Sequence, residues 1–181
     1  MFYVSEITKE APQKFLTELQ RETYQNLKKL AIPFERVETD EAITMSDCQV
    51  INQKLSMEMV KTLFLTNRQK TSFYLLVTTG EKPFKAKEFS QALGVARVSF
   101  ASIDLMEEIL GTKIGAATIF SGLLDSAKNV QIIIDEEVTH QTFYGCSDGT
   151  TTNYLKIDTQ DILAKYLPSI KNKVKIIELN K

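Results

Sequence analysis

Two apolar runs separated by a short polar stretch place the strongest constraint on the fold. Residues 59–66 and 72–78 are both rich in leucine, β-branched and aromatic side chains, and the polar residues 67–70 connect them. Adjacent residues of a strand point to opposite faces of its sheet, so the apolar residues of these runs require cover on both faces. The pattern predicts a β-hairpin at the centre of a sheet that is packed on both sides.

Lys61 lies inside the first of these runs, where a charged side chain needs a chemical reason. An ammonium group without a partner loses a large hydration free energy when it is buried. It must therefore reach the edge of the sheet or meet an anionic or strongly polar group. Either an internal carboxylate pairs with Lys61, or an anionic ligand does, and the strand by itself leaves both interpretations open.

The other expected elements mix helices and strands without strict alternation. Apolar residues at three- and four-residue steps predict an amphipathic helix over 12–30, and Ser46 with Gln49 predicts a capping box for a helix that ends near Leu55. Further elements are expected as helices over 85–93, 102–110 and 159–167, and as strands over 34–37, 95–100, 130–135, 138–144, 151–157 and 174–179. We therefore expect an α+β or mixed α/β fold, with a mixed, mostly antiparallel twisted sheet flanked by helices, in a single domain over residues 1–181.

Composition and charge narrow the classes of function. The chain has 43% hydrophobic and 25% charged residues and a net charge of -1, so no global basic field favours binding to duplex DNA, although binding to the end of an RNA stays open. Cys48 and Cys146 lie far apart and match no metal-binding spacing, and we expect no metal and no cofactor. No apolar run approaches the length of about 18 residues that a membrane span needs, and we expect a cytoplasmic protein with no membrane partner.

Two further segments have compositions that suit a ligand site. Three glycines punctuate residues 111–122, so this backbone can approach a ligand closely, and a tight connection between elements is an equally good interpretation. Residues 145–152 place hydroxyl groups beside Asp148, as in the floor of a polar pocket, although threonines are also ordinary in strands. His140 is the only histidine, and no triad-like signature supports a hydrolase built on it. The carboxylates of residues 135–137 are typical of a solvated turn.

Taken in order, the segments Lys61-Thr-Leu-Phe-Leu65 and Gly115-Ala-Ala-Thr-Ile-Phe120, followed by a threonine-rich strand, resemble the YbaK and prolyl-tRNA synthetase-associated editing-domain family. The likeness is strongest to freestanding members that clear mischarged tRNA(Pro), and it spans roughly residues 32–157. It implies that Lys61 contacts the phosphate and terminal-adenosine region of the substrate, and that the glycine-bearing loop lines the aminoacyl pocket. Carried over by motif, the catalytic residues are Lys61 and Gly115, and the substrate-binding residues are Lys61, Ala116, Ala117, Thr118, Phe120, Asp148, Thr150 and Thr152.

The resemblance implies a trans-editing deacylase that hydrolyses the ester of a small wrong amino acid on tRNA(Pro). Alanine is the first candidate, and cysteine and serine stay open. The expected partner is the acceptor end of a mischarged tRNA, and the chain is expected to be a monomer or a weak homodimer. Ile119, the Gly145-Cys146 pair and Gly149 stand where many members have a proline, a His-Pro pair and an asparagine. A second interpretation is therefore a non-catalytic module of the same fold that binds aminoacyl-adenosine, tRNA ends or a regulatory partner.

Overall fold

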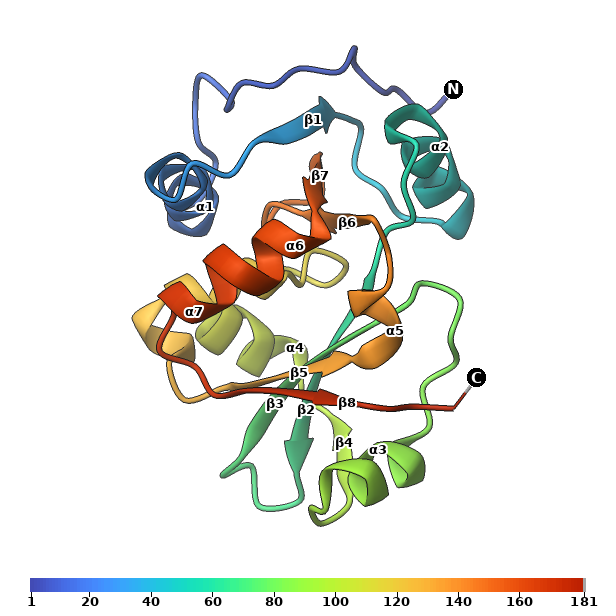
Figure 1. Cartoon of the computed structure of the whole chain (residues 1–181), viewed down its shortest axis with the longest axis vertical. Helices are drawn as coiled ribbons and strands as arrows, with labels where there is room; N and C mark the ends of the chain where they lie inside the picture. The colour runs from blue at the N-terminus through green and yellow to red at the C-terminus, as the bar shows by residue number, and fades with distance from the viewer. Residues whose placement is uncertain (181) are drawn as a thin grey trace.

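The computed structural model describes residues 1–180, whose strands form two sheets (Figure 1). The strands are β1 (Phe34–Glu38), β2 (Lys61–Asn67), β3 (Phe73–Thr78), β4 (Val98–Phe100), β5 (Gln131–Asp135), β6 (Phe143–Ser147), β7 (Asn153–Asp158) and β8 (Val174–Ile177). The α-helices are α1 (Glu18–Lys29), α2 (Met45–Leu55), α3 (Ala86–Leu93), α4 (Ile103–Leu105), α5 (Glu136–Thr139), α6 (Thr159–Asp161) and α7 (Leu167–Ser169). The remaining helical segments are η1 (Met106–Leu110), η2 (Ile119–Leu123), η3 (Asp125–Ala127) and η4 (Ile162–Tyr166). The expected mixed fold class is confirmed, with the strands divided between two sheets.

The expected hairpin is the pair β2 and β3, which lies inside the five-stranded sheet of order β4-β2-β3-β5-β8. β2 is antiparallel to β3 and β4, whereas β5 runs parallel to both β3 and β8. The three-stranded sheet has the order β1-β7-β6 and is antiparallel throughout. The neighbours Phe64 and Leu65 of β2 are buried in different hydrophobic clusters, so this strand is covered on both faces as predicted.

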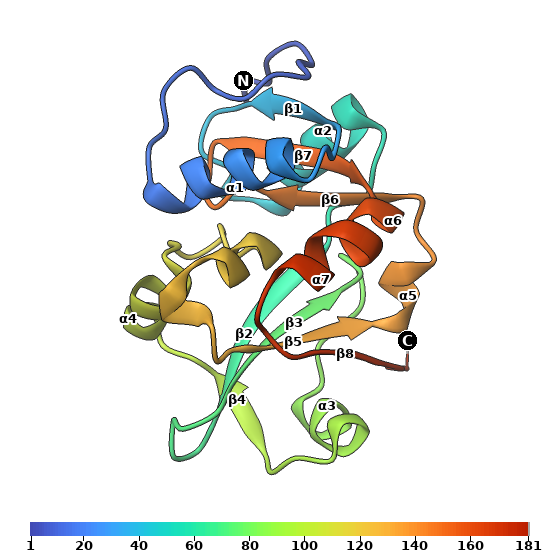
Figure 2. The same ribbon diagram turned by 60° about the vertical axis from the view of Figure 1, so that its left-hand side comes forward.

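Three hydrophobic clusters hold these layers together. The largest lies between the two sheets and includes residues of α1 and η4, which pack beside them (Figure 2). The helix α3 covers the other face of the five-stranded sheet, where Phe89 packs edge-on against Tyr74 of β3. The helix α2 covers the outer face of the three-stranded sheet through Ile51 and Leu55. The helices α1, α2 and α3 therefore each bury one apolar face against a sheet.

Two helix starts differ from the predictions because other side chains cap them. The first helix begins at Glu18 instead of residue 12, since the hydroxyl of Thr17 accepts a hydrogen bond from the backbone N–H of Gln20. The capping box of α2 uses Thr44 and Asp47 instead of Ser46 and Gln49. Asp47 brings a negative charge to the first turn, where the helix dipole favours it.

The segment 138–144 was predicted as one strand, and that prediction is wrong. Asp135 ends β5 and caps the short helix α5, because its carboxylate accepts the N–H of Glu137 at 3.1 Å. The chain re-enters a sheet only at Phe143, and β6 then continues to Ser147, into residues that were expected to form a loop.

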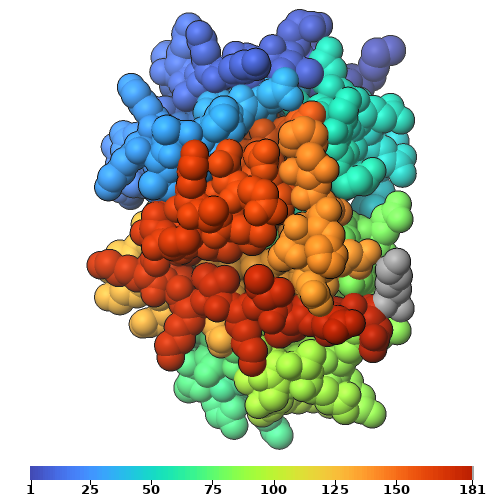
Figure 3. Space-filling view, viewed as in Figure 1, coloured from blue at the N-terminus to red at the C-terminus, as the bar shows by residue number. Residues whose placement is uncertain are grey.

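The N-terminal segment runs along the outer edge of β1, through bridges from Val4 to Thr39 and from Thr8 to Arg36. It covers the top of the molecule in Figure 3. An otherwise open sheet edge is thereby paired. Within residues 1–180, no helix has the length and apolar character that crossing a membrane requires.

Candidate functional site

A cavity of about 540 Å³ opens where the two sheets meet, and both sheets line it. Its walls come from α2, from the first half of β2, from the loop after β3, from the segment between β4 and η1, and from the glycine-bearing loop. Cys146 and Ser147 of β6 and Tyr154 of β7 complete the wall on the side of the three-stranded sheet. This volume lies in the usual range for sites of small organic ligands.

Gly145 joins the two sheets at the edge of this cavity. Its carbonyl accepts the N–H of Val60 at 2.9 Å, and it bridges to Met59 just before β2 begins. A Cβ atom at position 145 would lie 2.6 Å from the sulfur of Met57 and 3.1 Å from the carbonyl oxygen of Glu58. A side chain here requires its neighbours to move, so the glycine permits the close contact between the sheets.

Lys61 is the first residue of β2 and lines the cavity. The edge strand β4 pairs only with residues 65–67, so the start of β2 extends beyond it and Lys61 is only half-buried. Its ammonium group donates a hydrogen bond to the carbonyl oxygen of Lys82 at 2.5 Å and forms no ion pair within residues 1–180. A lysine ammonium has three N–H donors, so two stay available to a ligand.

The carboxylates near this position bind a different lysine. The buried ammonium of Lys82 contacts Asp135 and Glu137, each at 2.7 Å, and the carbonyl oxygen of Leu179 at 3.0 Å. Burial by itself lowers the pKa of Lys82, but hydrogen bonds and charge interactions with the two carboxylates outweigh burial and raise this pKa above its ordinary value. The segment 135–137 is therefore partly a buried ion cluster instead of a wholly solvated turn.

The glycine-bearing loop contributes Gly115 and Ala117 to the cavity wall. Gly115 has φ +84°, a conformation that favours glycine. Within residues 1–180, the N–H groups of Gly115 and Ala117 donate to no other group. Ala116, Thr118 and Phe120 are buried behind this surface and do not line the cavity. The loop therefore offers two free backbone donors next to the cavity.

The threonine-rich segment from Asp148 onward does not line the cavity, although Ser147 just before it does. Asp148 is fully buried and accepts hydrogen bonds from Gln20 at 2.9 Å, from Tyr24 at 2.6 Å and from the hydroxyl of Thr150 at 2.7 Å. Burial raises the pKa of Asp148 above its ordinary value, against these hydrogen bonds, which lower it. Thr152 also lies outside the cavity. This network ties the β6–β7 hairpin to α1.

The candidate nucleophiles near the cavity are poorly suited to attack an ester. The hydroxyl of Ser147 donates to the carbonyl oxygen of Thr150 at 2.6 Å, so its proton is already engaged. Burial raises the pKa of the Cys146 thiol, and burial followed by the charge of Asp47 raises that of Cys48, so the reactive thiolates are disfavoured. His140 ends the helix α5 and does not line this cavity.

The mouth of the cavity is apolar and exposed, which the sequence did not indicate. Its side chains come from separate elements, and Phe100, at the end of β4, is 61% exposed. The ring of Phe100 packs against that of Phe84 at 5.4 Å. The other exposed apolar residues of the mouth are Met45, Ile103 and Ile114. One sequence signal could have indicated this surface, namely the apolar Ile114 between Lys113 and Gly115.

Comparison with known proteins supports the resemblance inferred from the motifs. The chain is 28% identical over 148 residues to "Prolyl-tRNA synthetase associated domain-containing protein 1" of Danio rerio, a match that covers 81% of this chain and 80% of that protein. It is 25% identical over 153 residues to "Prolyl-tRNA editing protein ProX" of Acetoanaerobium sticklandii, covering 84% of this chain and 93% of that protein.

A solved structure of a candidate trans-editing enzyme for prolyl tRNA synthetase shares the fold. It has a TM-score of 0.65 and 16% sequence identity, and the match covers 92% of this chain and all of that one. The model of the aminoacyl-tRNA editing domain family matches residues 39–165, which is more than half of the sequence. The chain therefore belongs to the aminoacyl-tRNA editing domain family.

Proposed function

We propose that this chain is a single editing domain that acts in the cytoplasm and hydrolyses the ester between a small wrong amino acid and the 3′ end of a tRNA. The observation that carries the proposal is the cavity itself. Its wall contains Lys61, whose ammonium has no carboxylate partner, together with Gly115 and Ala117, whose backbone N–H groups are free. A cation and two neutral donors suit a substrate that joins a phosphate to an ester carbonyl.

In this mechanism Lys61 binds the terminal phosphate or ribose and fixes the position of the ester. Water adds to the ester carbonyl, and the N–H groups of Gly115 and Ala117 stabilise the oxyanion that forms. The bond from the carbonyl carbon to the ribose oxygen then breaks, a proton passes to that oxygen, and the free amino acid leaves. No covalent enzyme intermediate is needed, which agrees with the engaged hydroxyl of Ser147 and the raised pKa of the buried Cys146 thiol.

Alanine on tRNA(Pro) is the substrate that we propose first. The methyl side chain of Ala117 and the bare backbone of Gly115 line the cavity near the proposed ester position. A relative bears the name of a prolyl-tRNA editing protein, which supports tRNA(Pro) as the carrier. A synthetase site cannot strongly reject an amino acid smaller than its own, so a second site that admits small residues supplies the missing discrimination.

The apolar mouth suits the unpaired bases at the 3′ end of the tRNA. Bases of single-stranded RNA stack on exposed aromatic rings, and this stacking depends little on sequence. The ring of Phe100 is held from one side by Phe84 and is otherwise exposed. We propose that the terminal base lies against Phe100 while the acyl group enters the cavity.

A non-catalytic binding module is the second candidate, and Gly145 with Cys146 favours it. Neither residue supplies the imidazole that many family members are expected to have at this place, and the close contact with Met57 leaves little room for one. A panel of tRNAs charged with alanine, serine, cysteine or proline separates the candidates. Release of a small amino acid with proline retained supports the deacylase, whereas binding without release supports the module.

A further inference from the structure

The buried ion cluster of Lys82, Asp135 and Glu137 lies next to the cavity and is connected to Lys61 by a hydrogen bond. Lys82 is about as buried as a core residue, at 4% exposure of its side chain, and both Asp135 and Glu137 contact its ammonium group at 2.7 Å. Asp135 also accepts the hydroxyl of Thr78 at 2.7 Å, on the strand that pairs with Lys61. Together these contacts fix Lys82 at the ends of β3 and β5.

The backbone of Lys82 connects this ion cluster to the cavity. Its carbonyl oxygen accepts the hydrogen bond from the ammonium of Lys61, while its own side chain is held by the two carboxylates. The same loop lies close to the start of β2, since a Cβ atom at Gly80 would be 2.7 Å from the carbonyl oxygen of Met59. One residue therefore joins the ion cluster to the lysine of the site.

We propose that Glu137 and Asp135 are positioning residues, which set the place of the Lys61 ammonium through Lys82. This inference rests on the proposed function only for the consequence in catalysis. A lysine has four rotatable side-chain bonds, so a fixed carbonyl acceptor decides where its charge lies. When the two carboxylates hold the Lys82 ammonium less firmly, the carbonyl oxygen of Lys82 shifts and the ammonium of Lys61 samples other positions. Small displacements of a group that orients the substrate reduce the rate of the chemical step.

Glu137→Gln is the appropriate perturbation. The side chain of Glu137 is 38% exposed, so the amide keeps its shape and solvation while it loses the charge. Asp135 is less suitable, because its carboxylate also caps the helix α5. We expect Glu137→Gln to lower kcat/KM for deacylation by about tenfold, mainly through kcat.

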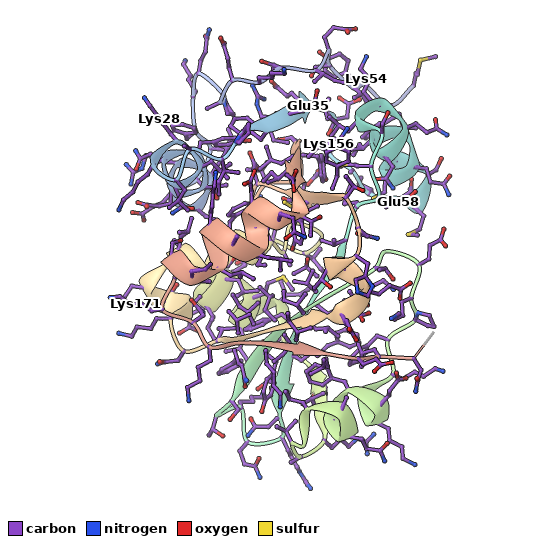
Figure 4. All side chains as sticks on the ribbon, viewed as in Figure 1. Lys28, Glu35, Lys54, Glu58, Lys156 and Lys171 are labelled. Carbon is purple, nitrogen blue, oxygen red and sulfur yellow. The ribbon has the colours of Figure 1, made fainter. Side chains whose placement is uncertain are left out.

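Glu35→Gln is a matched control on the other sheet. Glu35 is 34% exposed and pairs with the mostly buried Lys156 at 3.5 Å (Figure 4), and neither residue lines the cavity. The substitution removes the charge of a carboxylate that is about as exposed as Glu137 and that also pairs with a lysine. Glu35 does not contact the loop of Lys82. We expect kcat/KM to be unchanged in this variant.

The reactivity of the Lys61 amine gives a readout that requires no substrate. Wild type and both variants are treated briefly with an amine-acylating reagent, and the labelling rate of Lys61 is measured by mass spectrometry, with the exposed Lys28 and Lys171 as internal references (Figure 4). We expect Glu137→Gln to change the relative rate at Lys61 at least threefold and Glu35→Gln to leave it unchanged. Equal rates at Lys61 in wild type and Glu137→Gln overturn the proposal.

The two readouts separate this inference from the proposed function. If wild type releases no amino acid from any charged tRNA but the labelling rate changes in Glu137→Gln, the deacylase proposal falls and the positioning role stands. In an active enzyme, Glu137→Gln should have no further effect on kcat once Lys61 is replaced by methionine. A loss of the same factor in both backgrounds, or a general loss of folding at the assay temperature with no change at Lys61, contradicts positioning through Lys61.

Discussion

Removal of the Lys82 ammonium should destabilise the fold far more than removal of an ordinary surface charge. Lys82→Met keeps the length and apolar stem of the side chain but leaves Asp135, which is 1% exposed, without its cation. Breaking a buried ion pair on one side typically costs about 3–5 kcal/mol. Asp135 keeps the hydroxyl of Thr78 and the N–H of Glu137, so the lower end, about 3 kcal/mol, is expected here.

Urea unfolding followed by circular dichroism measures this cost at neutral pH. For a chain of this size the same change corresponds to a fall in Tm of about 6–12 °C. Lys128→Met is the control, because Lys128 is 53% exposed and its partner Asp125 lies at 3.5 Å on the surface, and a loss below about 1 kcal/mol is expected. The double variant Lys82→Met/Asp135→Asn should recover part of the loss, since no uncompensated charge stays buried. Equal free energies of unfolding for Lys82→Met and Lys128→Met would refute this reasoning.

Two further predictions concern the buried hydrogen-bond network of Asp148 and the mouth of the cavity. The pKa of Asp148 is raised in the folded state. At pH values just above the ordinary aspartate pKa of about 3.9, the folded state therefore keeps a proton that the unfolded state has lost. The contribution of Asp148 to stability falls as pH rises through this window. The free energy of unfolding of wild type relative to Asp148→Asn should therefore decline with rising pH there, and a flat difference across an acid titration contradicts the assignment. Phe100→Ala should weaken binding of a tRNA 3′ end by about fivefold to hundredfold if a base stacks on the ring, measured with an oligonucleotide that carries terminal 2-aminopurine. Ile43→Ala, an exposed apolar change outside the cavity, should not alter binding, and equal affinities for both variants exclude the stack.

Local patterns predicted the parts of the fold that depend on neighbouring residues. The apolar density of β2 and β3 required a covered hairpin, and the positive φ angles of Gly94 and Gly111 end helices where the sequence placed their ends. The misplaced start of α1 has a local cause too, because Pro12 suits the first turn of a helix, whereas Thr17 is the residue that caps it. Patterns over a few residues cannot choose between such competing start signals.

Long-range contacts account for what the sequence did not indicate at the site. The acceptor of Lys61 is a backbone carbonyl 21 residues away, and no side-chain pattern marks a carbonyl. Asp148 looked like a pocket residue because its partners on α1 lie more than 120 residues earlier in the chain. The acidic segment 135–137 looked solvated because its cation, Lys82, comes from another loop.

The most direct test of the central claim is single-turnover deacylation of alanyl-tRNA(Pro) by wild type and by Lys61→Ala. A charge-assisted hydrogen bond to the substrate contributes about 1.5–3 kcal/mol, so the rate should fall by about tenfold to hundredfold. Lys171→Ala removes an exposed lysine outside the cavity and should retain the full rate, and thermal unfolding should show that both variants are folded. Equal rates for Lys61→Ala and wild type would contradict the assignment of this cavity as the editing site.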